Sequence, residues 1–99
     1  MDIILFDDKQ YSLAEVCEIC NTQETFIIRI VEHGILEPKG ESTSEWVFSS
    51  NHLVKAKKSA RLYNDLSINI EGVSLAIDLL EELNELRQKI RLLEDESSM

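Results

Sequence analysis

The sequence RIVEHGILEP, residues 29–38, contains the point at which a short helix is expected to end and the chain to become extended. Gly34 is suited to the left-handed backbone conformation that commonly closes a helix. Pro38 follows four residues later and cannot continue a helix. The segment therefore predicts a helix over residues 23–33 that ends at Gly34, with an extended stretch after it.

Another helix is predicted immediately upstream. Ser12 and Glu15 have the three-residue spacing of a capping box, in which the hydroxyl accepts from a helix amide and the glutamate reaches back. This spacing predicts a helix over residues 13–20 and a break at 21–22. Two short helices joined by a tight turn form a helix-turn-helix. The apolar positions of the first helix fall on one face, as expected for a helix against a core: Leu13, Val16, Cys17 and Cys20.

Downstream of Gly34, the pattern predicts a small β-hairpin, or wing. Two strand-like segments, 35–37 and 45–48, flank a polar loop that contains Gly40. Trp46 and Phe48 alternate with a third apolar residue, so we expect both to pack inward on the helix-turn-helix. An exposed Trp46 that anchors a partner is the alternative, because interfaces favour tryptophan.

The C-terminal third is predicted to be one long helix. A third helix over 51–66 and a break at 67–69 come first, and the last helix covers 70–94. At 1.5 Å per residue it is about 36 Å long, which exceeds what the preceding segments can cover. Its apolar residues step by four, three, four and three, the spacing of a heptad seam. We expect these residues to pair with a second copy or with a partner helix: Leu79, Leu83, Leu86, Ile90 and Leu93.

The predicted fold is thus mainly α, a winged helix-turn-helix with a β-hairpin wing and a long C-terminal helix. Residues 1–68 are expected to form the head, residues 69–95 a helix partly packed on it, and residues 96–99 a disordered tail. The apolar run at 3–6 is interpreted as a short strand or an extended lead-in.

Charge is distributed unevenly along the chain, whose net charge is -9. Residues 1–50 contain ten acids and three bases, and residues 69–99 contain eight acids and three bases. Only residues 51–68 are basic, with four bases and one acid. DNA-binding proteins gain much of their affinity by neutralising phosphates, for which this chain has the wrong sign. An acidic surface favours a basic protein partner instead.

Catalytic and metal chemistry have little support in the sequence. Cys17 and Cys20 form a single CEIC pair on an apolar helix face, whereas a zinc site needs about four ligands. Buried, reduced cysteines are the favoured interpretation. His33 precedes Gly34, where a helix end favours a cation, so a capping role is expected. We therefore expect no enzyme activity, no metal and no cofactor.

The N-terminal sequence MDIILFDDKQ lacks the basic region and long apolar run of a signal peptide. No run approaches the roughly 18 apolar residues of a membrane span. A cytoplasmic location, with no membrane partner, is the expectation.

The order of elements resembles the MerR family. Members often have R-[FY]-Y-E-x-x-G-L at the end of the second helix. Arg29 and Glu32 fit that register, and Gly34 and Ile35 come one residue earlier than the glycine and leucine of the motif. The aromatic pair of the motif is replaced here by apolar residues at 30–31. The wing, usually rich in arginine, is KGESTSEWVF with two glutamates. The phosphate-binding residues of that family are therefore missing from the expected positions.

One branch of that family, the CbpM chaperone modulators, is a closer match. It is similar in the sequences GILEP at 34–38, WVF at 46–48, ARLYNDL at 60–66 and GVSLA at 72–76. The resemblance covers about residues 10–94 and implies a non-catalytic adaptor. Such a protein binds the J-domain of a DnaJ-like co-chaperone of the CbpA type and inhibits its co-chaperone and DNA-binding activities.

The leading hypothesis is therefore an inhibitory adaptor that presents acids to a basic J-domain face. The acidic first half of the chain could serve equally well. The residues expected to contact the partner are Asp65, Asp78, Glu81, Glu82 and Glu85.

Two other hypotheses stay open. A MerR-like transcription regulator would dimerise through the heptad seam and contact DNA with Arg29, Lys39 and the basic third helix. The third hypothesis is a subunit that only forms a homodimer through its C-terminal helix.

Overall fold

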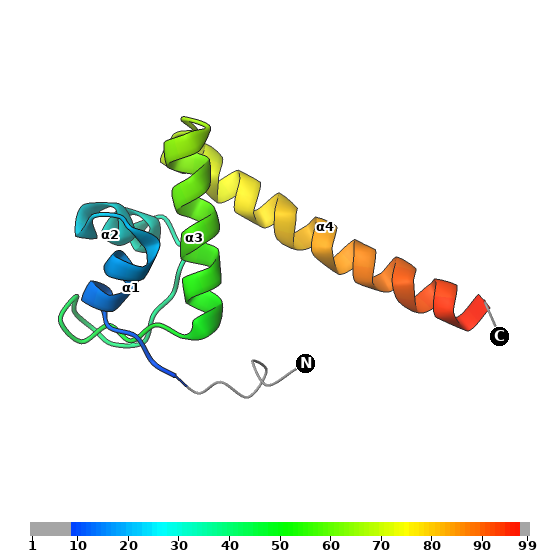
Figure 1. Cartoon of the computed structure of the whole chain (residues 1–99), viewed down its shortest axis with the longest axis horizontal. Helices are drawn as coiled ribbons and strands as arrows, with labels where there is room; N and C mark the ends of the chain where they lie inside the picture. The colour runs from blue at the N-terminus through cyan, green and yellow to red at the C-terminus, as the bar shows by residue number, and fades with distance from the viewer. Residues whose placement is uncertain (1–8, 98–99) are drawn as a thin grey trace.

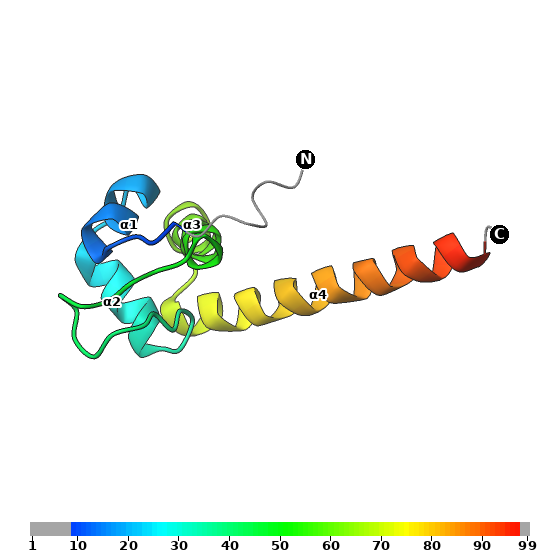
Figure 2. The ribbon, with the colours of Figure 1, turned by 90° about the horizontal axis from the view of Figure 1, so that it is seen from below.

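The computed structural model describes residues 9–97, which form a three-helix head and a projecting arm (Figure 1). Turned by 90°, the arm again leaves the head as a single straight helix (Figure 2). The molecule measures 52 × 31 × 22 Å. The helices are α1 (Leu13–Cys20), α2 (Glu24–Glu32), α3 (Ser50–Asp65) and α4 (Ile70–Ser97).

The capping box predicted at the start of α1 is confirmed. The Ser12 amide donates to Glu15 Oε1 at 2.8 Å, and the Glu15 amide donates to Ser12 Oγ at 3.2 Å. Asn21 ends the helix in the left-handed conformation, with φ 54°, and its amide bonds to the carbonyls of Cys17 and Glu18. These local signals explain why the predicted bounds of α1 agree with the structure.

The end of α2 also follows the prediction from residues 29–38. Gly34 has φ +76° and donates its amide to the carbonyl of Val31 at 3.0 Å. The Ile35 amide bonds back to the carbonyl of Ile30 at 2.9 Å. This left-handed closure directs Ile35 and Leu36 into the core, where both are buried.

The predicted β-hairpin wing is wrong, because residues 9–97 contain no strand. A single isolated bridge joins Lys39 and Val47 through two hydrogen bonds of 2.9 and 3.2 Å. Phe48 bridges to Tyr11 instead of continuing that pairing. The strand expected at residues 35–37 does not form, because its first residues belong to the end of α2. The amides of Ile35 and Leu36 both donate to the carbonyl of Ile30. Residues 35–48 therefore form a loop closed by one bridge.

The head encloses one apolar core. Phe48 is fully buried, and half-buried Trp46 packs on its ring edge-to-face at 6.1 Å. The inward packing expected of these two residues is confirmed, with Trp46 keeping some exposure. The core draws on every helix and on the loop: Leu13, Val16, Cys17, Phe26, Ile27, Ile30, Ile35, Leu36, Phe48, Ala56, Ala60, Ile70, Val73 and Ile77.

A short joint connects α3 to α4 where the sequence predicts a break. Ser67 adopts the left-handed conformation with φ 55°, and Asn69 Oδ1 accepts the amide of Gly72 at 2.8 Å to cap α4. The first two turns of α4 are held by Ile70, Val73 and Ile77, which are at most 3% exposed. Every described side chain from 78 to 95 is exposed, so the rest of the helix projects from the head.

Parts of the predicted organisation remain predictions. The segment at 3–6 lies outside the described residues, as do residues 98–99 of the expected tail, and α4 continues through Ser97. The division into a head of residues 1–68 and a helix of residues 69–95 stays a prediction. No helix in the described part is long and apolar enough to span a membrane.

Candidate protein-interaction surfaces

Five apolar residues of α4 beyond the head form a stripe on one exposed side, whereas Leu80 and Leu92 lie off it. Each residue of a helix advances by about 100°, so the buried Ile70, Val73 and Ile77 mark the side of α4 that faces the head. The predicted self-association residues lie roughly opposite and are 42–64% exposed. We call this set the leucine stripe: Leu79, Leu83, Leu86, Ile90 and Leu93.

The structure brings three of the predicted partner-binding acids together. Asp78, Glu82 and Glu85 are exposed and lie within about one-sixth of a turn of one another around α4. We call these three residues the acidic face. It borders the leucine stripe on one flank, and Leu75, which is 61% exposed, lies one turn before Asp78. Acid and apolar side chains are thus combined on the projecting helix.

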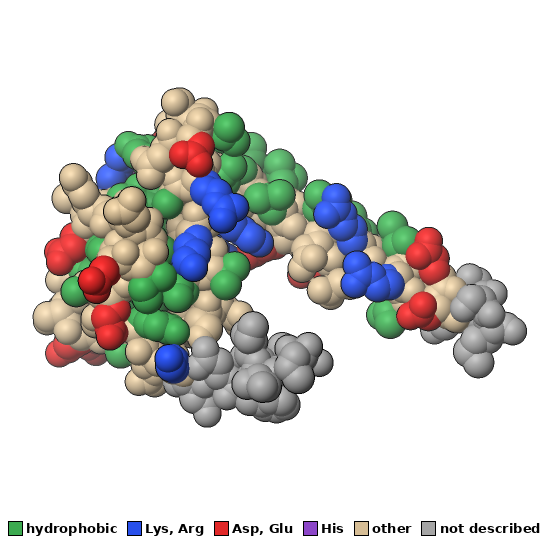
Figure 3. Space-filling model, viewed as in Figure 1, with side chains coloured by type: hydrophobic (Ala, Val, Ile, Leu, Met, Phe, Trp, Pro, Cys, Tyr) green, Lys and Arg blue, Asp and Glu red, His purple; other side chains and the backbone are tan. Residues whose placement is uncertain are grey.

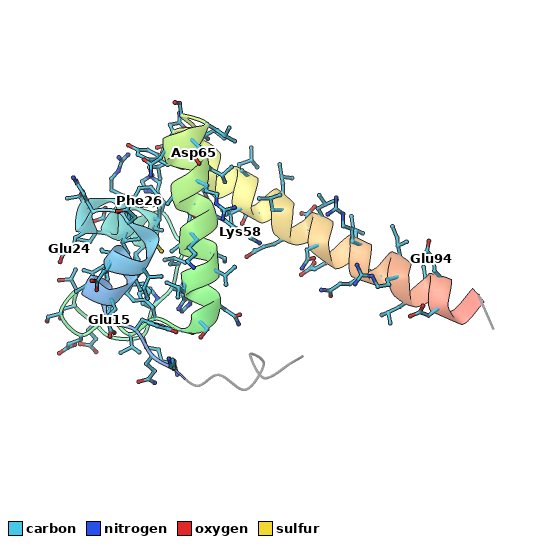
Figure 4. The ribbon with its side chains drawn as sticks, viewed as in Figure 1. Glu15, Glu24, Phe26, Lys58, Asp65 and Glu94 are labelled. Atoms are coloured by element: carbon cyan, nitrogen blue, oxygen red, sulfur yellow. The ribbon has the colours of Figure 1, made fainter. Side chains whose placement is uncertain are left out.

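The structure places the other two predicted acids elsewhere. Glu81 turns toward α3, where its Oε2 forms an ion pair with Lys55 Nζ at 2.9 Å. Asp65 is at the end of α3 and lines a cleft with Lys58 and Arg61 (Figure 4). Their side chains therefore do not join the acidic face, although both remain exposed.

Acids also lie on the head, away from α4. In the space-filling view, red side chains occupy the edge of the head opposite the arm (Figure 3). Glu15 and Glu24 belong to this group and project outward from α1 and α2 (Figure 4). The head thus offers a second acidic surface, as the composition of the first half suggests.

A cleft between α3 and α4 carries the opposite charge, and the sequence pattern alone does not indicate it. Lys58 and Arg61 on α3 and Arg87 on α4 line its outer section, which has a volume of about 490 Å³. Blue side chains gather there in Figure 3. The basic run of α3 lies on one helix, and Arg87 is remote from it in sequence. The joint at residues 67–69 brings α3 beside α4. That arrangement is the only sequence-level signal that could have placed Arg87 near the bases of α3.

The residues that the DNA-binding hypothesis requires are dispersed. Arg29 lies over the ring of Tyr63 at 5.9 Å, and its Nη1 donates to the tyrosine hydroxyl at 3.3 Å. Lys39 is in the bridged loop. Glu24 and Glu32, both exposed, lie at the two ends of α2, the helix that would have to approach DNA.

A histidine–carboxylate contact connects the end of α2 to the start of α4. His33 Nε2 is 3.5 Å from Glu71 Oε2, and His33 Nδ1 donates to the carbonyl of Arg29 at 2.9 Å. The hydrogen bond from its own backbone amide, assisted by His33, lowers the pKa of Glu71. His33 therefore contributes to the head–arm joint and ends α2, as the capping prediction expected.

The cysteines are placed as structural residues. Cys17 is buried and Cys20 half-buried, and both thiols are free. Burial raises the pKa of each thiol, which disfavours the reactive thiolate. Across residues 9–97, no group of three potential metal ligands comes together.

Comparisons with known proteins agree with this architecture. A family model described as "MerR HTH family regulatory protein" matches residues 11–95. The chain is 38% identical over 84 residues to the "Chaperone modulatory protein CbpM" of Pseudomonas entomophila (strain L48), covering 85% of this chain and 83% of the relative. It is 36% identical over 92 residues to the protein of the same name from Coxiella burnetii (strain Dugway 5J108-111), covering 93% and 87%.

Proposed function

This chain belongs to the CbpM family of chaperone modulatory proteins, and on that premise we propose that it is a non-catalytic adaptor that binds the J-domain of a DnaJ-like co-chaperone. Binding would inhibit the co-chaperone and DNA-binding activities of a CbpA-type partner in the cytoplasm. The resemblance in the sequence supports the partner class. The observation that carries the proposal is the acidic face on a helix that projects from the head.

The chemistry of α4 suits a basic, amphipathic partner surface. Asp78, Glu82 and Glu85 attract cations, and complementary charge raises the association rate and orients the partner. Charge alone gives little affinity, so an interface needs an apolar anchor. Leu75 is available for that role, because it is 61% exposed and lies one turn from Asp78 and two turns from Glu82. We propose that Leu75 is the anchor within this acidic surface.

The test is calorimetric titration with the isolated J-domain of a CbpA-type co-chaperone at several salt concentrations. The triple variant Asp78→Asn, Glu82→Gln, Glu85→Gln removes three charges from the acidic face. We expect it to weaken binding by about tenfold or more and to flatten the salt dependence. The matched control, Glu18→Gln, Glu32→Gln, Glu41→Gln, removes three exposed charges from the head.

Equal losses in the two triple variants would mean that only net charge matters. A larger loss in the control would assign J-domain binding to acidic residues of the head. Binding that is independent of salt in the wild-type chain would contradict an electrostatic interface altogether.

We also propose that the leucine stripe pairs two copies of the chain. Its five residues are exposed, and burying such a stripe in a helix pair is favourable. Sedimentation should then give twice the 11.4 kDa chain mass, and Leu86→Glu with Ile90→Glu should return it to one chain. Ile19→Glu, a matched change at a 44% exposed residue on α1, should leave the dimer intact. A wild-type chain that sediments as a monomer at tens of micromolar would reject the pairing.

A further inference from the structure

The α3–α4 cleft is continuous along both helices. Its outer section is lined by Lys58, Leu62, Leu66, Leu83 and Arg87, among others. A second section of about 490 Å³ extends toward the start of α3 at Asn51 and His52, and it shares Lys58, Leu80 and Asn84 with the first. The two helices diverge with distance from the joint that connects them (Figure 1).

The charge of the cleft is opposite to that of the chain as a whole. Lys58, Arg61 and Arg87 line the outer section, against a single carboxylate, Asp65. None of these three bases forms an ion pair with another described residue. The cations are therefore available to a ligand, in a chain whose net charge is -9.

The floor of the cleft is apolar. Leu62 and Leu66 are one turn apart on α3, and Leu80 and Leu83 are one turn apart on α4, where Leu83 is shared between the cleft and the edge of the leucine stripe. Leu66, Leu80 and Leu83 are 64%, 41% and 42% exposed, although each is large and apolar. Exposed apolar surface rimmed by charges marks interaction sites. Two rows of leucines on neighbouring helices form the ridges between which a third helix can pack.

We propose that the α3–α4 cleft binds an acidic amphipathic helix of a second protein partner, whose apolar stripe enters the cleft and whose carboxylates contact Lys58, Arg61 and Arg87. The acidic face of α4 attracts cations, so the two surfaces of the arm select partners of opposite charge. The leucines of the floor supply the apolar contact that affinity requires. This inference does not depend on the J-domain proposal.

The probe is a fluorescent amphipathic peptide of about three heptads, with leucine at the a and d positions and glutamate at e and g. A peptide with glutamine in place of each glutamate is its neutral control. We expect the wild-type chain to bind the glutamate peptide in fluorescence anisotropy and to bind the glutamine peptide at least about tenfold more weakly.

Matched variants of the chain locate the site. Lys58→Glu with Arg87→Glu reverses two charges in the cleft, and we expect it to weaken binding of the glutamate peptide by about tenfold or more. Lys57→Glu with Lys89→Glu reverses two charges on the same helices, away from the cleft lining. We expect this control to stay within about twofold of the wild type. Arg61→Gln is a milder second variant, and circular dichroism checks that each variant is folded.

Several results would overturn the proposal. The wild-type chain would fail to bind the glutamate peptide, or the two double variants would lose affinity for the peptide equally. Unchanged affinity in the Lys58→Glu, Arg87→Glu variant would be a third such result. If the cleft variant abolished self-association and the peptide competed with a second copy of the chain, the occupant would be that copy and not a separate partner. Titration of the cleft variant with the J-domain separates this proposal from the J-domain proposal. The variant retains Asp78, Glu82 and Glu85, so its affinity for the J-domain should be unchanged.

Discussion

Two glycines in the loop after α2 have left-handed φ angles but different surroundings. A Cβ at Gly34 would meet nothing within 4 Å, whereas a Cβ at Gly40 would press on the carbonyl of Glu45, 2.7 Å from its carbon. We expect Gly34→Ala to destabilise the protein by about 1 kcal/mol and Gly40→Ala by more, about 2–3 kcal/mol. Urea unfolding of the two variants measures the loss in the free energy of unfolding for each. Equal losses would show that the bridged loop moves to accommodate the new Cβ at position 40.

His52 makes the start of α3 sensitive to pH. Its Nδ1 accepts the amide of Ser49 at 3.1 Å, which requires an unprotonated nitrogen, while Ser49 Oγ accepts the amide of His52 at 3.1 Å. Burial, assisted by Lys55, lowers the pKa of His52. Because the folded-state pKa of His52 is lowered, the neutral imidazole stabilises the fold at pH values above the ordinary histidine pKa of about 6.5. This stability is lost as the pH falls through the folded-state pKa.

The matched variant for this effect is His52→Gln, because glutamine can complete the capping box without titrating. The melting temperature of the wild-type chain should fall more between pH 7.5 and pH 5 than that of the variant. Parallel curves for the two proteins would show that His52 does not contribute to the pH dependence.

At the scale of elements, local signals predicted the helices well. Ser12, Glu15 and Gly34 determine helix ends through contacts within a few residues, so the sequence is sufficient to identify them. The wing was mispredicted because strand pairing depends on where the flanking chain is held. Leu36 is drawn into the core and Phe48 pairs with Tyr11, which leaves one bridge in place of a hairpin.

The candidate surfaces were partly predictable for the same reason. Asp78, Glu82 and Glu85 are neighbours on one helix, so helical periodicity groups them. Glu81 is only a few residues away but pairs with Lys55 on α3, a tertiary contact that no periodicity gives. The α3–α4 cleft depends wholly on such contacts.

The two halves of α4 should differ in their importance for stability. Ile77→Ala removes a side chain that is 3% exposed at the joint, and we expect a loss of about 2–5 kcal/mol in the free energy of unfolding. Ile90→Ala, at a residue that is 55% exposed in the same helix, should cost less than about 1 kcal/mol under monomeric conditions. Chemical unfolding of the two variants at low protein concentration compares their free energies of unfolding. Similar losses would mean that the outer part of α4 is packed against other residues in solution.

At the scale of the whole molecule, the net charge of -9 opposes binding to nucleic acid. The helix-turn-helix framework is present, but Glu24 and Glu32 flank the surface of α2, and Arg29 is held against Tyr63. We expect no complex with random duplex DNA in a gel shift, even at low salt, because phosphate neutralisation requires clustered cations. A complex that dissociates steeply as salt rises would favour the transcription-regulator hypothesis.

The confinement of buried α4 residues to its first two turns has an evolutionary consequence. Substitutions are retained when the fold stays above its stability threshold, and most of the cost of mutation arises in packed cores. Ile70, Val73 and Ile77 bear that cost for α4, whereas every described side chain from 78 to 95 is exposed. The outer arm can therefore diverge and acquire new binding specificities while the head continues to fold.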